Sequence, residues 1–286
     1  MIQLGQYNTF KILSQKKDGL LLIDDEAQTV FLPKKHCPET VEIDDEIEVF
    51  VYQDNTGQKL GTLAKPKIRF HEFAMLRVTA VAEVGAFMDW GIERELFVPF
   101  REQKQKMEAN RWYIVYLDLD LKTDRLYASS RLDRFLQNDH LSVKEGEEVE
   151  ILIRQKTDLG FSVIVNHRHT GLIFENEIFK PLRIGEKVTG FIKKIHPDNK
   201  IDIALQPAGY DQAIQRNTEI VLTTLSENKG FLPLTDSSPP EEISEWLGIS
   251  KKAFKKAVGA LYKEKNIRLL DNGIELISQN SGSSRR

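Results

Sequence analysis

The chain has 286 residues, of which 41% are hydrophobic and 29% charged, and its formal net charge is −3. This composition is that of an ordinary globular protein, and the sequence contains no run of about 18 apolar residues that could cross a membrane. Residues 1–6 lack the basic start and apolar stretch of a signal peptide. Cys37 is the only cysteine, which excludes an internal disulfide and a thiolate zinc cage. These features predict a cytoplasmic protein without membrane contact.

The charge is distributed unevenly along the chain. Residues 1–66 carry 7 Lys/Arg against 11 Asp/Glu, residues 67–134 carry 12 against 11, residues 135–207 carry 10 against 11, and residues 208–286 carry 11 against 10. The net charge argues against binding nucleic acid over the whole surface, so any such binding must come from local clusters. The first segment is the poorest candidate for holding phosphate.

From residue 1 to about 207, short β-rich runs alternate with Gly, Asp and Asn turns, which predicts sandwiches or barrels rather than βαβ units. The runs fall into three sets of five: 7–13, 19–23, 29–32, 47–52 and 60–64; then 74–83, 86–90, 96–100, 112–117 and 126–129; then 149–153, 161–165, 171–174, 187–194 and 201–205.

The three sets form an internal repeat of roughly 65 residues. Its clearest shared piece is the third run, Thr-Val-Phe-Leu-Pro at 29–33 against Glu-Leu-Phe-Val-Pro at 95–99. Five strands in this length is the size of an OB-fold, a small Greek-key barrel whose open face often takes oligonucleotides. We therefore predict three OB barrels at 1–66, 67–134 and 135–207, the first of them degenerate.

The C-terminal segment, 208–286, has a different character. Residues 208–225 are compatible with a helix, and Ser238 is expected to cap a second helix that has Pro239 in its first turn and ends at Gly248. Ser250 caps a third helix, 251–265, whose apolar positions share one face. Residues 267–277 form a hairpin around an Asn-Gly turn, and the Ser/Gly-rich tail at 280–286 is expected to be mobile.

These elements predict a mainly β protein with a C-terminal α+β domain. Three tandem five-stranded OB-fold barrels are followed by a winged helix-turn-helix.

The strongest candidate for base contact is Phe87, within Val-Gly-Ala-Phe-Met-Asp at 84–89. This string resembles the Gly-x-Phe-Val signature of the ribosomal S-one type of OB-fold. The resemblance implies that Phe87 stacks on a base and that Arg125 contacts the nucleic-acid backbone. One stacked base contributes about 1–3 kcal/mol with little sequence preference. The alternative is that Phe87 packs in the core, although strand alternation places Met88 on the opposite face.

In the third unit, Gly-Leu-Ile-Phe-Glu-Asn-Glu at 171–177 resembles another string of that family, with Phe174 replacing a histidine. Base contact is expected from Phe174 or Phe161, with core packing as the competing interpretation. Lys200 falls where Arg125 does in the second unit. Lys193 and Lys194 add charge nearby.

In the expected recognition helix, a group of lysines shares the polar side, comprising Lys251, Lys252, Lys255 and Lys256. Lysines there suit phosphate, and the helix offers no Arg, Asn or Gln to read base edges. The alternative is a solvated helix face.

The sequence indicates no catalytic site, no metal site and no cofactor. His167-Arg168-His169 is interpreted as a turn rather than a metal pair, because no acidic third ligand is placed near it. No P-loop, nucleophile elbow, zinc-protease motif or triad spacing is present.

The order of units, with the strings at 238–243 and 250–262, resembles the bacterial conserved virulence factor B family along the whole chain. The resemblance implies a bacterial, non-catalytic protein that binds RNA, single-stranded RNA above all, and influences the expression of other genes. A DNA-binding transcription regulator acting through the winged helix is the alternative. A ribosome- or nuclease-associated adaptor ranks below it, and an enzyme lower still.

Overall fold

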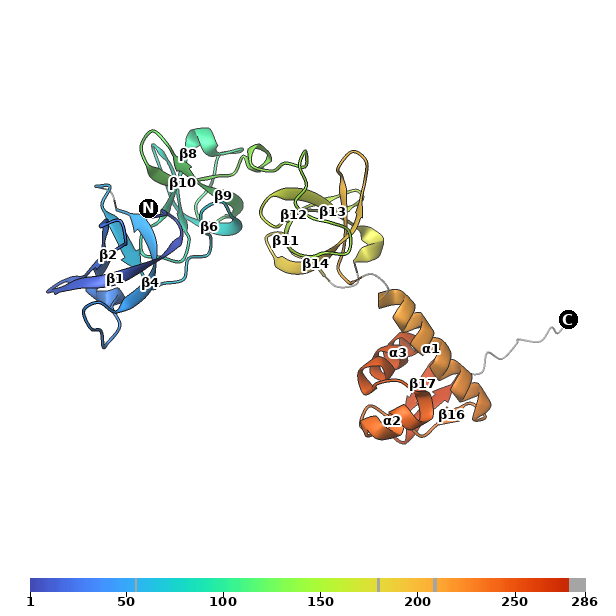
Figure 1. The fold of residues 1–286 in the computed structure, drawn as a ribbon. Coiled ribbons are helices and arrows are strands. Elements are labelled where there is room, and N and C mark those ends of the chain that lie inside the picture. The colour runs from blue at the N-terminus through green and yellow to red at the C-terminus, as the bar shows by residue number, and fades with distance from the viewer. Residues whose placement is uncertain (55, 179–180, 208–209, 278–286) are drawn as a thin grey trace. The chain divides into compact units, whose positions relative to one another are not determined.

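Figure 1 shows the fold in a computed structural model, which describes residues 1–54, 56–178, 181–207 and 210–277. The chain divides into two compact units, Met1–Leu205 and Gln206–Arg286. The tail at 280–286, expected to be mobile, lies outside the described residues. Among the described helices, none is long and apolar enough to span a membrane.

The first unit contains three sheets of five strands each. The first barrel consists of β1 (Tyr7–Lys16), β2 (Gly19–Ile23), β3 (Thr29–Pro33), β4 (Glu46–Gln53) and β5 (Lys59–Thr62). The second consists of β6 (Phe73–Ala82), β7 (Gly85–Asp89), β8 (Leu96–Pro99), β9 (Trp112–Asp120) and β10 (Arg125–Ser129). The third consists of β11 (Glu148–Thr157), β12 (Gly160–Val165), β13 (His169–Phe174), β14 (Lys187–Ile195) and β15 (Ile201–Ala204).

The repeat predicted from the sequence is present in three dimensions. The first strand of each barrel carries a register shift at the same place, between Ile12 and Ser14, Val78 and Ala80, and Ile153 and Gln155. Such a bulge bends the strand so that it pairs with neighbours on both sides. A single-turn 3-10 helix follows the third strand of each barrel: η1 (Lys34–His36), η2 (Phe100–Glu102) and η4 (Glu175–Glu177). A further one, η3 (Leu132–Arg134), follows β10.

The barrels differ in how they close. The first and third are closed in the orders β1-β2-β3-β5-β4 and β11-β12-β13-β15-β14, each through a parallel pair of its third and fifth strands. The second has the order β10-β9-β6-β7-β8, without a hydrogen-bonded β8–β10 pair among the described strands. Cα atoms of β8 and β10 still approach within 8 Å of each other. The second barrel therefore has the five predicted strands but an open edge between β8 and β10.

Adjacent barrels pack on one another within the first unit. Phe50 and Tyr52 of the first barrel share a buried cluster with Trp90 of the second, and the Phe50 and Trp90 rings meet edge to face with centroids 5.6 Å apart. Phe73 of the second barrel lies in another buried cluster with Ile164 of the third. Burial of these aromatic faces stabilises the junctions.

His167 and Arg168 lie in the turn between β12 and β13, as predicted, whereas His169 begins β13. His167 links the second and third barrels. Its Nδ1 accepts a hydrogen bond from the Phe73 backbone N–H at 2.9 Å, and its Nε2 lies 3.1 Å from a Glu150 carboxylate oxygen. The neutral tautomer protonated at Nε2 satisfies both contacts. Burial lowers the pKa of His167, and the charge of Lys187 lowers it further. The carboxylates of Glu72 and Glu150 raise this pKa by a smaller amount, so the net shift is downward.

A pH-dependent stability follows from His167. Because its folded-state pKa is lowered, its contribution is fully present above the unfolded-state value of about 6.5 and is lost as the pH falls toward the folded-state pKa. We expect the melting temperature of the wild type to fall more steeply between pH 7.5 and 5.5 than that of His167→Gln, which keeps an acceptor but does not titrate. The exposed His140→Gln is the control. Parallel pH profiles for wild type and His167→Gln would contradict this assignment.

The second unit is a winged helix. It consists of α1 (Tyr210–Glu227), β16 (Phe231–Leu232), α2 (Pro240–Leu247), α3 (Lys251–Lys263), β17 (Ile267–Leu270) and β18 (Gly273–Leu276), with the sheet order β16-β18-β17. Phe254, Ala257, Val258 and Leu261 of α3 are buried, as their spacing predicts. The sequence did not predict β16, because two residues are too short to show alternation.

The two helix caps have different outcomes. Ser250 caps α3, its Oγ accepting from the Ala253 N–H at 3.2 Å, and Gly248 ends α2 with a φ of 64°, both as predicted. The prediction that Ser238 caps α2 is wrong. Pro239 holds the capping position, and the Ser238 hydroxyl instead accepts from the Thr235 N–H at 3.0 Å.

Candidate nucleic-acid interface

An aromatic pair lies on the outer side of the second barrel. Phe87 of β7 and Phe97 of β8 are register partners, with ring centroids 5.3 Å apart and planes inclined at 40°. Their neighbours Ala86 and Met88 are fully buried, so alternation turns the two rings away from the core. Phe87 therefore has the orientation predicted from the sequence.

Gly85 lets the two strands that carry this pair approach closely. Its φ is +155°, and a Cβ at this position would lie 2.3 Å from the carbonyl oxygen of Val98. Glycine is therefore required where β7 meets β8.

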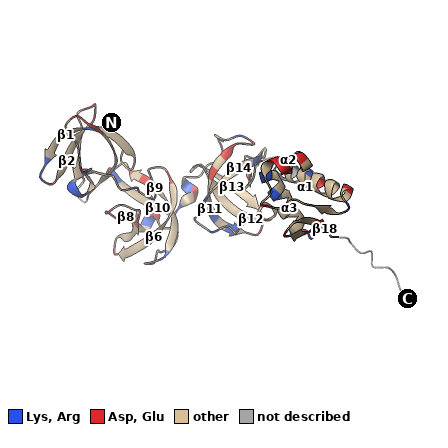
Figure 2. Cartoon of the chain, turned by 90° about the horizontal axis from the view of Figure 1, so that it is seen from below, with Lys and Arg blue, Asp and Glu red and all other residues tan. Residues whose placement is uncertain are grey.

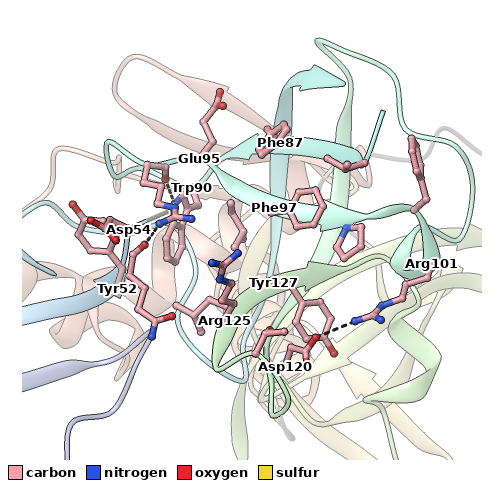
Figure 3. A pocket seen from close by; sticks show the side chains of 18 residues that line it. Tyr52, Asp54, Phe87, Trp90, Glu95, Phe97, Arg101, Asp120, Arg125 and Tyr127 are labelled. Carbon is pink, nitrogen blue, oxygen red and sulfur yellow. Dashed lines mark hydrogen bonds and ion pairs between the residues drawn. The ribbon is translucent and has the colours of Figure 1, made fainter. Parts of the chain in front are cut away.

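The aromatic pair borders a groove of about 640 Å³ where β8 and β10 fail to pair (Figure 3). We call it the second-barrel groove. Its lining combines aromatic and charged side chains, including Tyr52, Asp54, Phe87, Trp90, Arg94, Glu95, Phe97, Phe100, Arg101, Asp120, Arg125 and Tyr127. Aromatic rings suit bases and guanidinium groups suit phosphates, so the groove has the chemistry of a single-strand site.

The cations in the groove are held by different partners. Arg125 opens β10 at the groove, as predicted, and lies between Tyr52 on one side and Phe97 on the other (Figure 3). The Arg101 guanidinium lies 3.1 Å from the Asp120 carboxylate. Hydrogen bonds from the turn at Lys122 and then from Arg101 lower the pKa of Asp120. Because Arg101 is exposed, a phosphate can compete for it.

The first barrel contributes one end of the groove through Tyr52, Gln53 and Asp54. Arg94 of the second barrel fixes this end, since its guanidinium donates to the Gln53 backbone carbonyl. Burial lowers the pKa of Arg94. The first barrel, which its composition made the poorest candidate for holding phosphate, therefore lines part of this groove.

The third barrel has a groove of its own, also about 640 Å³. Phe174 and Lys200 line it, together with Ser162 and Leu172. The Lys200 ammonium lies 2.6 Å from Asp198, and this contact raises the pKa of Lys200. The structure thus brings together two of the residues predicted for this barrel.

Three other residues predicted in the third barrel lie elsewhere. Phe161 is half-buried and packs against the hydrophobic core, because alternation along β12 gives it the same side as Val163 and leaves Ser162 toward the groove. For Phe161 the packing interpretation therefore holds. Lys193 pairs with Glu177, and neither Lys193 nor Lys194 is among the described residues lining the groove.

The four lysines predicted in the winged helix lie on α3. Lys252 and Lys255 are exposed, whereas Lys251 and Lys256 are half-buried. Lys255 lies 3.4 Å from the Asp236 carboxylate. Basic and acidic residues are interspersed over both units, and acidic residues are prominent on α2 (Figure 2). Any basic contact surface is therefore local, as the charge count predicted.

The two histidines next to Arg168 have structural roles. His169 is fully buried, its Nδ1 2.7 Å from the Gln137 carbonyl and its Nε2 2.9 Å from the Ser142 hydroxyl. Within the described ranges, no group of three or more His, Cys, Asp or Glu side chains is arranged to hold a metal ion.

Comparisons with known proteins agree with this architecture. Residues 4–64 match the S1 domain family, and residues 219–276 match the CvfB-like winged helix domain family. Conserved virulence factor B of Staphylococcus epidermidis is 23% identical over 283 residues, covering 96% of this chain and 94% of that protein. The chain is similar to the conserved virulence factor B proteins along most of its length. The fold class and the family resemblance predicted from the sequence are confirmed.

Other similar proteins span most of the chain. The uncharacterized protein YitL of Bacillus subtilis is 27% identical over 268 residues, covering 91% of this chain and 89% of that protein. A crystal structure of a multidomain protein with nucleic acid binding domains from Streptococcus pneumoniae covers 96% of this chain and 98% of that chain, at 24% identity and a TM-score of 0.40. The two matched domain families indicate nucleic-acid binding as the class of function.

Sequence reasoning missed several residues of the second-barrel groove. Phe97 lies in the repeated segment at 95–99, and its place between the buried Leu96 and Val98 was a usable signal. Tyr52 and Arg94 carried no such signal, because their positions depend on how the first barrel packs on the second.

Proposed function

We propose that this chain is a non-catalytic RNA-binding protein of the cytoplasm that regulates gene expression after transcription. Single-stranded RNA binds on the open faces of the second and third barrels, and the winged helix adds phosphate contacts. The observation that carries this proposal is the outward-facing Phe87–Phe97 pair beside the unpaired edges of β8 and β10.

The aromatic pair favours single strands for a physical reason. A base can lie flat on an aromatic ring only when it is unpaired and unstacked from its neighbours, which a duplex does not allow without base flipping. Arg125 and Arg101 line the same groove and supply cations for the adjoining phosphates. Phe174 and Lys200 repeat this combination in the third barrel.

Filter binding of the intact chain to three probes of equal length tests the proposal: single-stranded RNA, single-stranded DNA and duplex DNA, each at two salt concentrations. We expect single-stranded RNA to bind more tightly than duplex DNA at both. Single-stranded DNA reports how much the 2′-hydroxyl contributes. Equal or tighter binding to duplex DNA near physiological salt would overturn the proposal.

A DNA-binding transcription regulator is the second candidate. The observation that favours it is the position of four lysines on α3, the helix that enters the major groove in helix-turn-helix proteins. The absence of Arg, Asn and Gln from the 251–263 segment weighs against sequence-specific reading of duplex DNA. In the same titration this candidate requires duplex DNA to bind most tightly.

A further inference from the structure

The end of the second-barrel groove shared with the first barrel has a different chemistry from the rest. Asp54, just after β4, and Glu95, just before β8, line this groove from two different barrels. Tyr52 and Asp54 lie at one end, Phe87 and Phe97 lie toward the other, and Arg125 lies between them (Figure 3). A strand whose phosphate meets Arg125 would therefore have one neighbouring base near Tyr52 and Asp54 and the other near Phe87 and Phe97.

The Asp54 carboxylate is held by the loop that follows β4, whereas Glu95 is an exposed side chain. Asp54 Oδ1 accepts hydrogen bonds from the backbone N–H groups of Thr56 and Gln58 at 2.8 and 2.9 Å, and from the Thr56 hydroxyl at 2.6 Å. These hydrogen bonds lower the pKa of Asp54, and the bond from the Thr56 hydroxyl contributes most. The Asp54 carboxylate is therefore charged at neutral pH. Glu95 follows Arg94, whose guanidinium reaches the first barrel and whose carbonyl accepts from the Trp90 indole N–H.

The two carboxylates of this end accept hydrogen bonds, and the neighbouring Arg94 guanidinium attracts Asp54. Asp and Glu accept from the exocyclic amino group of cytosine, whereas uracil presents a carbonyl oxygen at the same position. We propose that Asp54 and Glu95 select a base that carries an amino group, so that the groove prefers cytosine to uracil beside the base stacked on Phe87. This inference rests on the proposed RNA-binding function and gives the first barrel a role in specificity.

The test compares nine-residue oligocytidylate and oligouridylate by fluorescence anisotropy with the full chain near pH 7.5. For the wild type we expect about ten-fold tighter binding to oligocytidylate, the size of one good base contact. The double variant Asp54→Asn/Glu95→Gln should bring the two affinities together, mainly by improving oligouridylate binding. Amides supply donors for the uracil carbonyl.

Two further variants separate the possible outcomes. Glu48→Gln, an exposed carboxylate of β4 outside the groove lining, should leave the ratio of affinities unchanged, which shows that general charge is not responsible. Phe87→Ala should weaken both oligomers. The proposed preference for cytosine is overturned if the wild type binds the two oligomers equally, or if the double variant keeps the wild-type ratio of affinities. In either case the proposed RNA-binding function still stands, provided that Phe87→Ala weakens binding. If Phe87→Ala weakens neither oligomer, the groove is not the RNA site and both proposals fail.

Discussion

Replacing Phe87 with alanine is expected to weaken binding of single-stranded RNA by about 1–3 kcal/mol, or roughly five- to 150-fold. The ring lies outside the core, beside Phe97, and lines a groove open to solvent. Truncation therefore removes a stacking surface without leaving an enclosed cavity, and the melting temperature should change little. Fluorescence anisotropy and thermal unfolding of the same sample measure both effects.

Trp112→Ala is the matched control for that experiment. Trp112 opens β9 of the same barrel and is 53% exposed, but it does not line the groove. Its loss removes a comparable aromatic surface and should leave RNA affinity unchanged. If Phe87→Ala lowers the melting temperature sharply, or if both variants weaken RNA binding equally, Phe87 is not a stacking platform.

Replacing the four α3 lysines Lys251, Lys252, Lys255 and Lys256 with glutamine should flatten the dependence of log K on log salt by about two units. Each phosphate contact on a single strand contributes about −0.7 to that slope, so two units corresponds to about three lost contacts. Preference among RNA sequences should persist, because lysine acts as a mobile point charge.

The control for the lysine variant is Lys16→Gln/Lys17→Gln, which removes exposed cations from the first barrel. It should leave the salt slope as it is. An unchanged slope in the α3 variant would show that this helix does not touch nucleic acid. The winged helix would then serve protein contacts or dimerisation, which the fold permits.

Local patterns in the sequence were sufficient to predict most of the fold. Alternation and turn residues predicted the five strands of each barrel. Alternation also placed Phe87 and Met88 on opposite faces of β7, and Met88 is buried in the structure. The same alternation, applied to β12, would have placed Phe161 on the core side. Ser162 occupies the outward position, and Phe161 packs against the core, which was the competing interpretation.

What the sequence did not show depends on contacts between distant segments. The open edge between β8 and β10 cannot be inferred from strands that individually resemble those of the closed barrels. The first barrel has an acidic composition, which argued against a binding role, yet Tyr52 and Asp54 reach the groove once Phe50 has packed on Trp90. The net charge of the first barrel therefore did not reveal that two of its side chains line the groove.

Photo-crosslinking tests the central claim, that RNA lies in the second-barrel groove, most directly. The intact chain is irradiated with a short single-stranded RNA containing 4-thiouridine, and the modified peptides are identified by mass spectrometry. Crosslinks should concentrate in the 85–101 segment, which carries Phe87 and Phe97, and should be lost from it in Phe87→Ala. Efficient crosslinking that leaves the 85–101 segment unmodified would contradict the assignment of this groove to RNA.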